Sequence, residues 1–134
     1  MNDRASALRH ERHYTVAEAN AERAWAAGQV ARVRDSLELL ADPEAEDALE
    51  AIDPDGGGGY PGREVATAVM RLLAGLSELE SKEVLLRDPE RGLVDFPSLR
   101  DGEEIYLCWL VDEDEVAWWH HHDTGFTGRQ PLLV

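Results

Sequence analysis

The chain has 134 residues, with 13 Lys and Arg against 28 Asp and Glu, so its formal net charge is −15. This length predicts a single domain, 1–134, large enough to bury a hydrophobic core. The single cysteine, Cys108, excludes an intramolecular disulfide and a zinc cluster of cysteines, and it favours a reducing compartment. No apolar run reaches the roughly 18 residues of a membrane-spanning helix, and the N-terminus lacks a signal-peptide pattern. We therefore expect a soluble cytoplasmic protein.

The charges are unevenly distributed along the chain. From Asp35 to Gly62 there are nine carboxylates and no basic residue. Such a block repels the phosphates of nucleic acids and the headgroups of anionic lipids. Neither nucleic acid nor a membrane surface is therefore expected as a partner.

The first element in chain order is a long helix, predicted over 16–41. Thr15 is followed three residues later by Glu18, which is the pattern of a capping box. A helix of this length spans about 39 Å, and it should end before Pro43, since proline disfavours helical geometry in the preceding residue. Small or apolar residues recur along it at steps of three and four, at Val16, Ala19, Ala26, Val30, Val33, Leu37 and Leu40.

A flexible linker is predicted over 42–62, in which Glu44–Ile52 could form a short helix. It is acidic, and four consecutive glycines in it lie between two prolines, a composition typical of a mobile connection. Two long helices joined in this way predict an antiparallel hairpin. The second helix is predicted over 63–87, with one apolar stripe formed by Val65, Val69, Leu72, Leu76 and Leu79.

The remaining residues, 92–134, are predicted to form a small sheet and a C-terminal loop. Three antiparallel strands are expected over Leu93–Phe96, Glu104–Val111 and Val116–His121, where β-branched and aromatic residues concentrate. The predicted fold class is therefore α+β, a long antiparallel helical hairpin followed by a small three-stranded antiparallel sheet.

The turn between the last two strands predicts their register. Pairing Val111 with Val116 across the acidic turn places Leu107 opposite His120, Trp109 opposite Trp118, and Cys108 opposite Trp119. The tryptophans then belong to the core of the sheet. Cys108 is expected to be a buried, unreactive thiol.

Five blocks of sequence stand out in this order: Tyr14–Asn20, Gly92–Pro97, Tyr106–Trp109, Trp119–His120 and Gly125–Leu132. Together they resemble a small prokaryotic family known as domain of unknown function 2203. The resemblance implies a helical pair followed by a small sheet, and it brings no established reaction, ligand or cofactor. One departure is Ala21–Trp25, which replaces a leucine-proline pair of the family, so the start of the first helix is expected to pack differently.

The only nitrogen-rich cluster consists of three consecutive histidines and Asp123. Strand alternation places His120 and His122 on one face, and two imidazoles with a carboxylate are a ligand set for a first-row divalent metal. The competing interpretation is an exposed, unligated histidine run at a strand end. His120 alone lies in a family block, as either an acid–base group or a half-buried histidine satisfied by the backbone.

Two further residues are candidates for a ligand site. Arg129 follows a glycine-bounded turn, 125–128, whose N–H groups could join the guanidinium in binding a small anion. The alternative is an ion pair with Asp95 or Asp123 that fastens the tail. Asp95 itself is either a turn cap or a site residue. The candidate ligand-binding set is therefore Asp95, His120 and Arg129.

The sequence contains no phosphate-binding loop, dinucleotide-binding glycine set, or hydrolase or metalloprotease motif. Two functions of different class follow. The favoured one is a non-enzymatic binding or assembly module whose helical hairpin pairs with a second copy to form a homodimer, because the helices carry more apolar stripe than a three-stranded sheet can cover. The alternative is a small enzyme or ligand-binding protein with an anion or metal site at the sheet. Whether the chain is an enzyme stays open.

Overall fold

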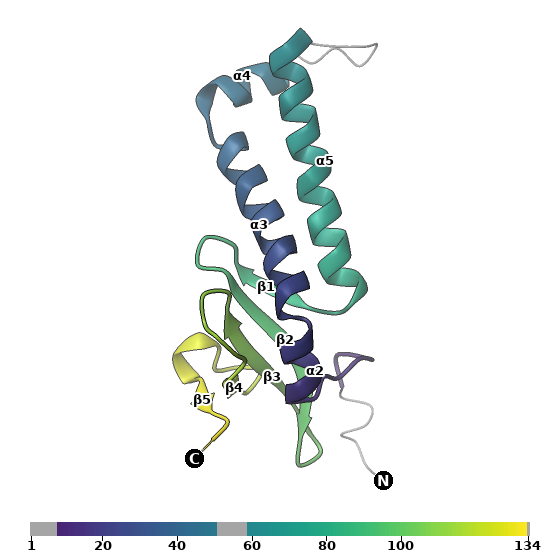
Figure 1. Cartoon of the computed structure of the whole chain (residues 1–134), viewed down its shortest axis with the longest axis vertical. Coiled ribbons are helices and arrows are strands. Elements are labelled where there is room, and N and C mark those ends of the chain that lie inside the picture. Colours follow the sequence, from purple (N-terminus) through teal and green to yellow (C-terminus); the bar gives the residue numbers. More distant parts are fainter. Residues whose placement is uncertain (1–7, 51–58, 134) are drawn as a thin grey trace.

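Two long helices extend side by side away from a small sheet in the computed structural model, which describes residues 8–50 and 59–133 (Figure 1). The helices are α2 (Val16–Ala21), α3 (Arg23–Leu40), α4 (Pro43–Glu50) and α5 (Gly59–Ser81). The strands are β1 (Leu85–Asp88), β2 (Leu93–Arg100), β3 (Glu103–Leu110), β4 (Trp118–His120) and β5 (Gln130–Pro131), with a 3₁₀ turn at Phe126–Gly128. In the described part of the chain, no helix has the length and apolarity needed to cross a bilayer.

The helix predicted over 16–41 is divided into α2 and α3. The capping box is present, since the Thr15 side chain accepts the N–H of Glu18 and the Glu18 carboxylate accepts the N–H of Thr15. The division falls at Glu22, whose N–H bonds to the Ala19 carbonyl three residues back. This shorter step tightens the turn, and α2 ends there, one residue before α3 begins.

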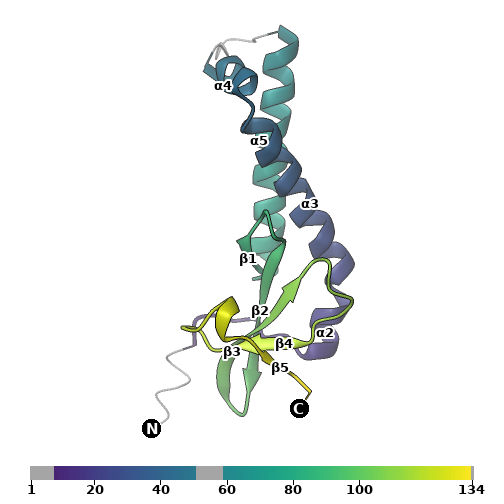
Figure 2. The same cartoon turned by 90° about the vertical axis from the view of Figure 1, so that its left-hand side faces the viewer.

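Close packing joins α3 to α5, and the two helices stay together in both views (Figures 1 and 2). Val33 of α3 and Val65 and Ala68 of α5 are buried. At Gly75 the helices approach so closely that an added Cβ would lie 2.9 Å from Cγ2 of Val33. A small residue at this position therefore sets the distance between the helices.

The segment predicted as a linker contains a helix. Pro43 is the first residue of α4, and the Asp42 carboxylate accepts the N–H of Glu44, so the segment carries a helix start signal. Residues 51–58, which include three of the four consecutive glycines, lie outside the described residues. The predicted flexibility of 42–62 therefore stays a prediction.

α5 ends at Ser81, six residues before the predicted end of the second helix. The N–H of Val84 bonds to the Leu79 carbonyl and the N–H of Glu83 to the Glu80 carbonyl, the two bonds of a Schellman motif. Glu83 occupies the left-handed position of this motif, with φ of 55°. Glycine is the usual residue there, so the sequence carries no ordinary stop signal.

The sheet has five strands in the order β1-β2-β3-β4-β5, each antiparallel to the next, so the prediction of three strands is wrong. The helix predicted over 63–87 covers most of β1, because the true helix end has Glu83 rather than glycine in the left-handed position. β5 has only two residues, too few to show an alternating pattern.

The predicted register of the last two long strands is also wrong, by one residue. Tyr106 lies opposite His120, Leu107 opposite Trp119, and Cys108 opposite Trp118. The turn is longer than predicted, because the Val116 N–H bonds to the Asn20 side chain of α2 rather than to β3. Because strand side chains alternate between the two faces, this slip changes which residues share a face: His120 lies beside Tyr106 rather than beside Leu107.

The two faces of the sheet differ in chemistry. One face packs on the helices through apolar side chains, which join Tyr14, Ala19, Ala26, Val30 and Leu79 in the hydrophobic core. The sheet contributes Val94, Phe96, Ile105, Leu107, Trp109 and Trp119 to this core. Because strand side chains alternate, the intervening residues point to the opposite face. That face carries Asp95, Tyr106, Cys108, Trp118 and His120.

Candidate functional site

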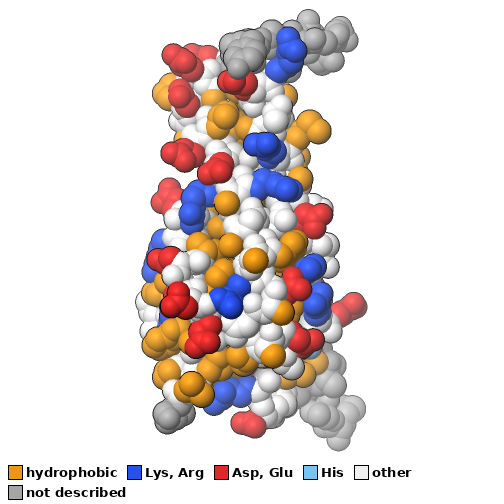
Figure 3. Space-filling view, viewed as in Figure 1, with side chains coloured by type: hydrophobic (Ala, Val, Ile, Leu, Met, Phe, Trp, Pro, Cys, Tyr) orange, Lys and Arg blue, Asp and Glu red, His pale blue; other side chains and the backbone are white. Residues whose placement is uncertain are grey.

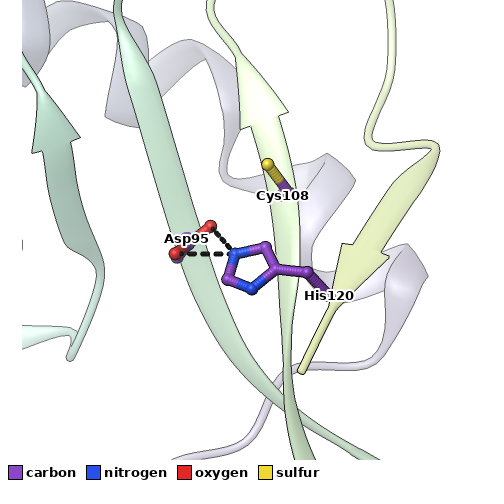
Figure 4. A group of neighbouring side chains, drawn as sticks. All are labelled: Asp95, Cys108 and His120. Atoms are coloured by element: carbon purple, nitrogen blue, oxygen red, sulfur yellow. Dashed lines mark hydrogen bonds and ion pairs between the residues drawn. The ribbon is translucent and has the colours of Figure 1, made fainter. Parts of the chain in front are cut away.

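Three side chains from adjacent strands meet on the polar face of the sheet (Figure 4). They are Asp95 of β2, Cys108 directly opposite it on β3, and His120 of β4. Their relative exposures are 2%, 0% and 2%. One donor atom from each lies within 4.8 Å of the others, and in the described part of the chain no other group of three such residues meets this spacing.

Both ring nitrogens of His120 have partners. Nε2 lies 3.0 Å from each carboxylate oxygen of Asp95, and Nδ1 lies 2.7 Å from the carbonyl oxygen of His121. A carbonyl can only accept, so Nδ1 carries a proton. Burial lowers the pKa of His120, but the hydrogen bonds to Asp95 and to the His121 carbonyl outweigh it, and the pKa is raised. With a proton on Nδ1, the position of Nε2 between the two Asp95 oxygens favours the charged form of the imidazole.

A residue that the sequence did not indicate completes this pair. Nε of Arg87, on β1, lies 2.9 Å from Oδ2 of Asp95, and its guanidinium carbon lies 5.0 Å from the centroid of the Tyr106 ring. Arg87 lies at the end of the helix predicted over 63–87, where the structure instead has β1, so the sequence predicts no strand neighbour for it. β1 has only four residues and reads Leu-Leu-Arg-Asp, so no alternation of apolar and polar residues in the sequence points to Arg87.

Cys108 is a free, buried thiol. Burial and the negative charge of Asp95 raise the pKa of Cys108 to about 12, while Arg129 acts in the opposite direction. The group is therefore a neutral thiol near pH 7. This supports the prediction of an unreactive cysteine, since the thiolate is the nucleophile.

Arg129 lies at the edge of the same group, but its ion-pair partner is Glu113 rather than Asp95 or Asp123. Nη1 of Arg129 lies 4.0 Å from Sγ of Cys108. The guanidinium carbon lies 4.4 Å from the Trp118 centroid and 4.8 Å from that of Phe126. The arginine is thus held by one carboxylate and two rings.

Two N–H groups at the end of the glycine-bounded turn bond within the turn. The Gly128 N–H bonds to the Gly125 carbonyl, and the Arg129 N–H bonds to the Phe126 carbonyl. These donors satisfy the turn itself. The predicted anion cradle at 125–128 therefore has no free donors at these two positions.

The predicted metal set of His120, His122 and Asp123 is not brought together. Nε2 of His122 lies 3.1 Å from Oε1 of Glu104, without the geometry of a hydrogen bond, and its ring lies 4.8 Å from that of Tyr106. Burial and the neighbouring Arg9 lower the pKa of His122. Asp123 is exposed. His120 instead faces Asp95 and Cys108.

A second polar cluster surrounds Glu104, a buried carboxylate at the start of β3. It accepts the N–H groups of Arg9 and His10 and contacts Nε2 of His13 at 2.7 Å. Burial raises the pKa of Glu104, but these donors outweigh it, and the pKa is lowered. The cluster fastens the N-terminal segment to the sheet, and no sequence pattern predicted it.

Two surface grooves lie away from the polar face. One of about 1090 Å³ runs between α3 and α5 and is lined by residues such as Ala31, Arg32, Leu39, Met70 and Ala74. Another, of about 430 Å³, lies where α2 meets the turn after β3. Neither is lined by Asp95, Cys108 or His120.

A family described as "Uncharacterized conserved protein (DUF2203)" matches residues 12–132. No curated protein and no solved structure matches the chain. The matched residues include all five strands and the whole Asp95, Cys108 and His120 group. The resemblance noted in the sequence is thereby confirmed, and the chain belongs to the family of uncharacterized conserved proteins DUF2203.

Proposed function

We propose that this protein is a non-enzymatic cytoplasmic assembly module that forms a homodimer through α3 and α5. The observation that carries the proposal is the exposure of large apolar side chains on these helices. Met70, Leu73 and Leu76 of α5 are 72%, 59% and 41% exposed, and Leu37 of α3 is 40% exposed. Several exposed large apolar side chains on one pair of helices are typical of an association site.

The spacing of these residues favours a helical partner. Met70, Leu73 and Leu76 are three residues apart, so they follow one another along one side of α5. The sheet lies beside only one end of the two helices, and the rest of their length extends beyond it (Figures 1 and 2). A second copy can therefore align its own helices there and form a four-helix bundle with an isologous interface.

The negative net charge of the chain opposes dimer formation. Each copy carries a net charge of −15, so two copies repel one another over the range of the Debye length. Hydrophobic, basic and acidic side chains alternate over the helical part of the face in Figure 3, so this repulsion is not concentrated there. Association through apolar side chains should therefore become stronger as salt screens the net charge.

The alternative is a small enzyme or anion-binding protein that uses Asp95, His120 and Arg129, and it has less support. Both nitrogens of His120 are bonded within the protein, and Arg129 is paired with Glu113. His120 would have to break one of these contacts to reach a substrate, and the Arg129 guanidinium already has a carboxylate partner within the protein.

Size-exclusion chromatography with light scattering at micromolar concentration tests the proposal. We expect a mass twice that of the chain, and Leu73→Glu should convert it to the mass of one chain. Leu133→Glu is the matched control, because it adds the same charge at an exposed leucine outside the helices. A single-chain mass at both low and high salt would refute self-association.

A further inference from the structure

We propose that Asp95, Cys108 and His120 together bind one Zn²⁺ ion, through a carboxylate oxygen, Sγ and Nε2. The set differs from the histidine cluster that the sequence indicated, and it does not depend on self-association. Carboxylate, thiolate and imidazole are the three protein ligand types of zinc. Here one of each comes from β2, β3 and β4, which are hydrogen-bonded neighbours.

The distances suit a shared ion. The three donor atoms lie within 4.8 Å of one another. Zinc binds these donors at roughly 2.0–2.3 Å, so donors in a tetrahedral site are separated by somewhat less than twice that distance. Small side-chain rotations bring these three donors to that separation, since the backbones of paired strands already hold them at neighbouring positions.

Each proposed ligand already has an outer partner that orients it. Nδ1 of His120 donates to the His121 carbonyl, which leaves Nε2 for the ion. Oδ2 of Asp95 accepts from Arg87, and Nη1 of Arg129 approaches Sγ of Cys108. Metal-bound histidines commonly donate their second N–H to a carbonyl, and ligands in general carry such supporting bonds. The guanidinium of Arg129 is balanced by Glu113 and does not add a free positive charge.

Zinc binding releases protons, because Sγ and Nε2 are ligands only in their unprotonated forms. When Zn²⁺ binds, Sγ of Cys108 gives up its proton, and Nε2 of His120 gives up any proton that it shares with Asp95; these protons leave to solvent. A carboxylate, a thiolate, a neutral imidazole and Zn²⁺ together carry no net charge, so the two anionic ligands offset the charge of the ion in the buried site.

The expected role of the ion is structural. Neither groove near α3 is lined by the three ligands, and the ligands are almost wholly buried. The described residues bring no fourth donor to the group, so water would complete a tetrahedral site. An ion here would join three strands of the sheet and stabilise the folded state by mass action.

Cobalt is the first probe, because a Co²⁺–thiolate bond gives a near-ultraviolet charge-transfer band. The reduced, metal-free full-length protein is titrated with Co²⁺ and then with Zn²⁺. We expect one equivalent of Co²⁺ to bind with that band and with the strong visible absorption of a four-coordinate ion. Zn²⁺ should remove both signals at one equivalent. Bound Co²⁺ without a charge-transfer band, or no bound Co²⁺, would overturn the proposal.

Two variants identify the ligands. Cys108→Ser should abolish the charge-transfer band and weaken Zn²⁺ binding at least tenfold in competition with a chromophoric chelator. His122→Asn is the matched control, because His122 belongs to the same run of three histidines as His120 but is not a proposed ligand. It should leave both readouts unchanged. Loss of binding in His122→Asn with retention in Cys108→Ser would assign the ion to the histidine run instead. Circular dichroism checks that each variant is folded, and the wild-type cobalt spectrum decides the proposal if either is not.

Discussion

The two faces of the sheet are stabilised by different kinds of interaction. The face toward the helices holds apolar side chains such as Phe96 and Leu107, whose burial is non-directional. The opposite face holds charged groups that depend on directed contacts, with Asp95 between Arg87 and His120. On the apolar face, the loss of stability caused by a substitution should increase with the side-chain volume removed. On the polar face, removing any one partner should leave a buried charge uncompensated.

The largest expected effect is on the apolar face. Phe96→Ala should lower the free energy of unfolding by about 3–5 kcal/mol, because it leaves a cavity in a fully buried site. Urea denaturation followed by tryptophan fluorescence measures this change. Leu99→Ala, at an exposed position on the same strand, is the control and should stay within about 0.5 kcal/mol. Similar losses for the two variants would show that burial does not determine stability on this face.

On the polar face, Asp95→Asn should cost about 3 kcal/mol. The substitution preserves shape but removes the negative charge that His120 and Arg87 both contact in a buried site. The same denaturation experiment measures the loss. In the double variant with His120→Asn, part of it should be recovered, because no uncompensated charge remains. Asp123→Asn, at an exposed carboxylate, is the control. Strictly additive losses in the double variant would contradict a coupled pair.

A smaller effect is expected at the edge of the polar face. Arg129→Ala should lower stability by about 1–2 kcal/mol, since it removes stacking on two rings and leaves Glu113 without its partner. Arg129→Lys keeps the charge but loses the planar fork, so it should recover less than half of the loss. Thermal melting of both variants measures the difference. Full recovery with lysine would mean that charge alone holds the C-terminal loop.

The smallest effect is a dependence on pH. The pKa of His120 is raised in the folded state, so its contribution to stability is fully present below its ordinary pKa of about 6.5. That contribution is lost as the pH rises through the folded-state pKa. Melting temperatures between about pH 6 and 9 should therefore fall more in the wild-type protein than in His120→Asn. Parallel curves would show that His120 does not change protonation over this range.

What the sequence could predict about the fold depended on periodicity. α3, α5, β2 and β3 have regular apolar spacing, and their positions were found with errors mainly at the ends. β1 was missed because Glu83 takes the left-handed position that usually reveals itself as glycine. The register of β4 was missed because Asn20, distant in sequence, holds the preceding loop.

The candidate site shows the same division. Asp95, His120 and Arg129 were singled out by residue type, and the structure brings Asp95 and His120 into contact, with Arg129 beside Cys108. The partners of these residues were not predicted, because Arg87 and Glu113 lie in segments whose path is set by tertiary contacts. Local pattern identifies chemically unusual residues, but it does not show which of them meet.

The order of the strands bears on how the chain folds. Every strand pairs with the next strand in sequence, so the sheet is built from short loops, which favour rapid folding. The contacts that Glu104 makes with Arg9, His10 and His13 join residues 95, 94 and 91 positions apart. Closing so long a loop costs more entropy than forming any of the hairpins. The N-terminal segment should therefore dock last, onto a sheet that is already formed.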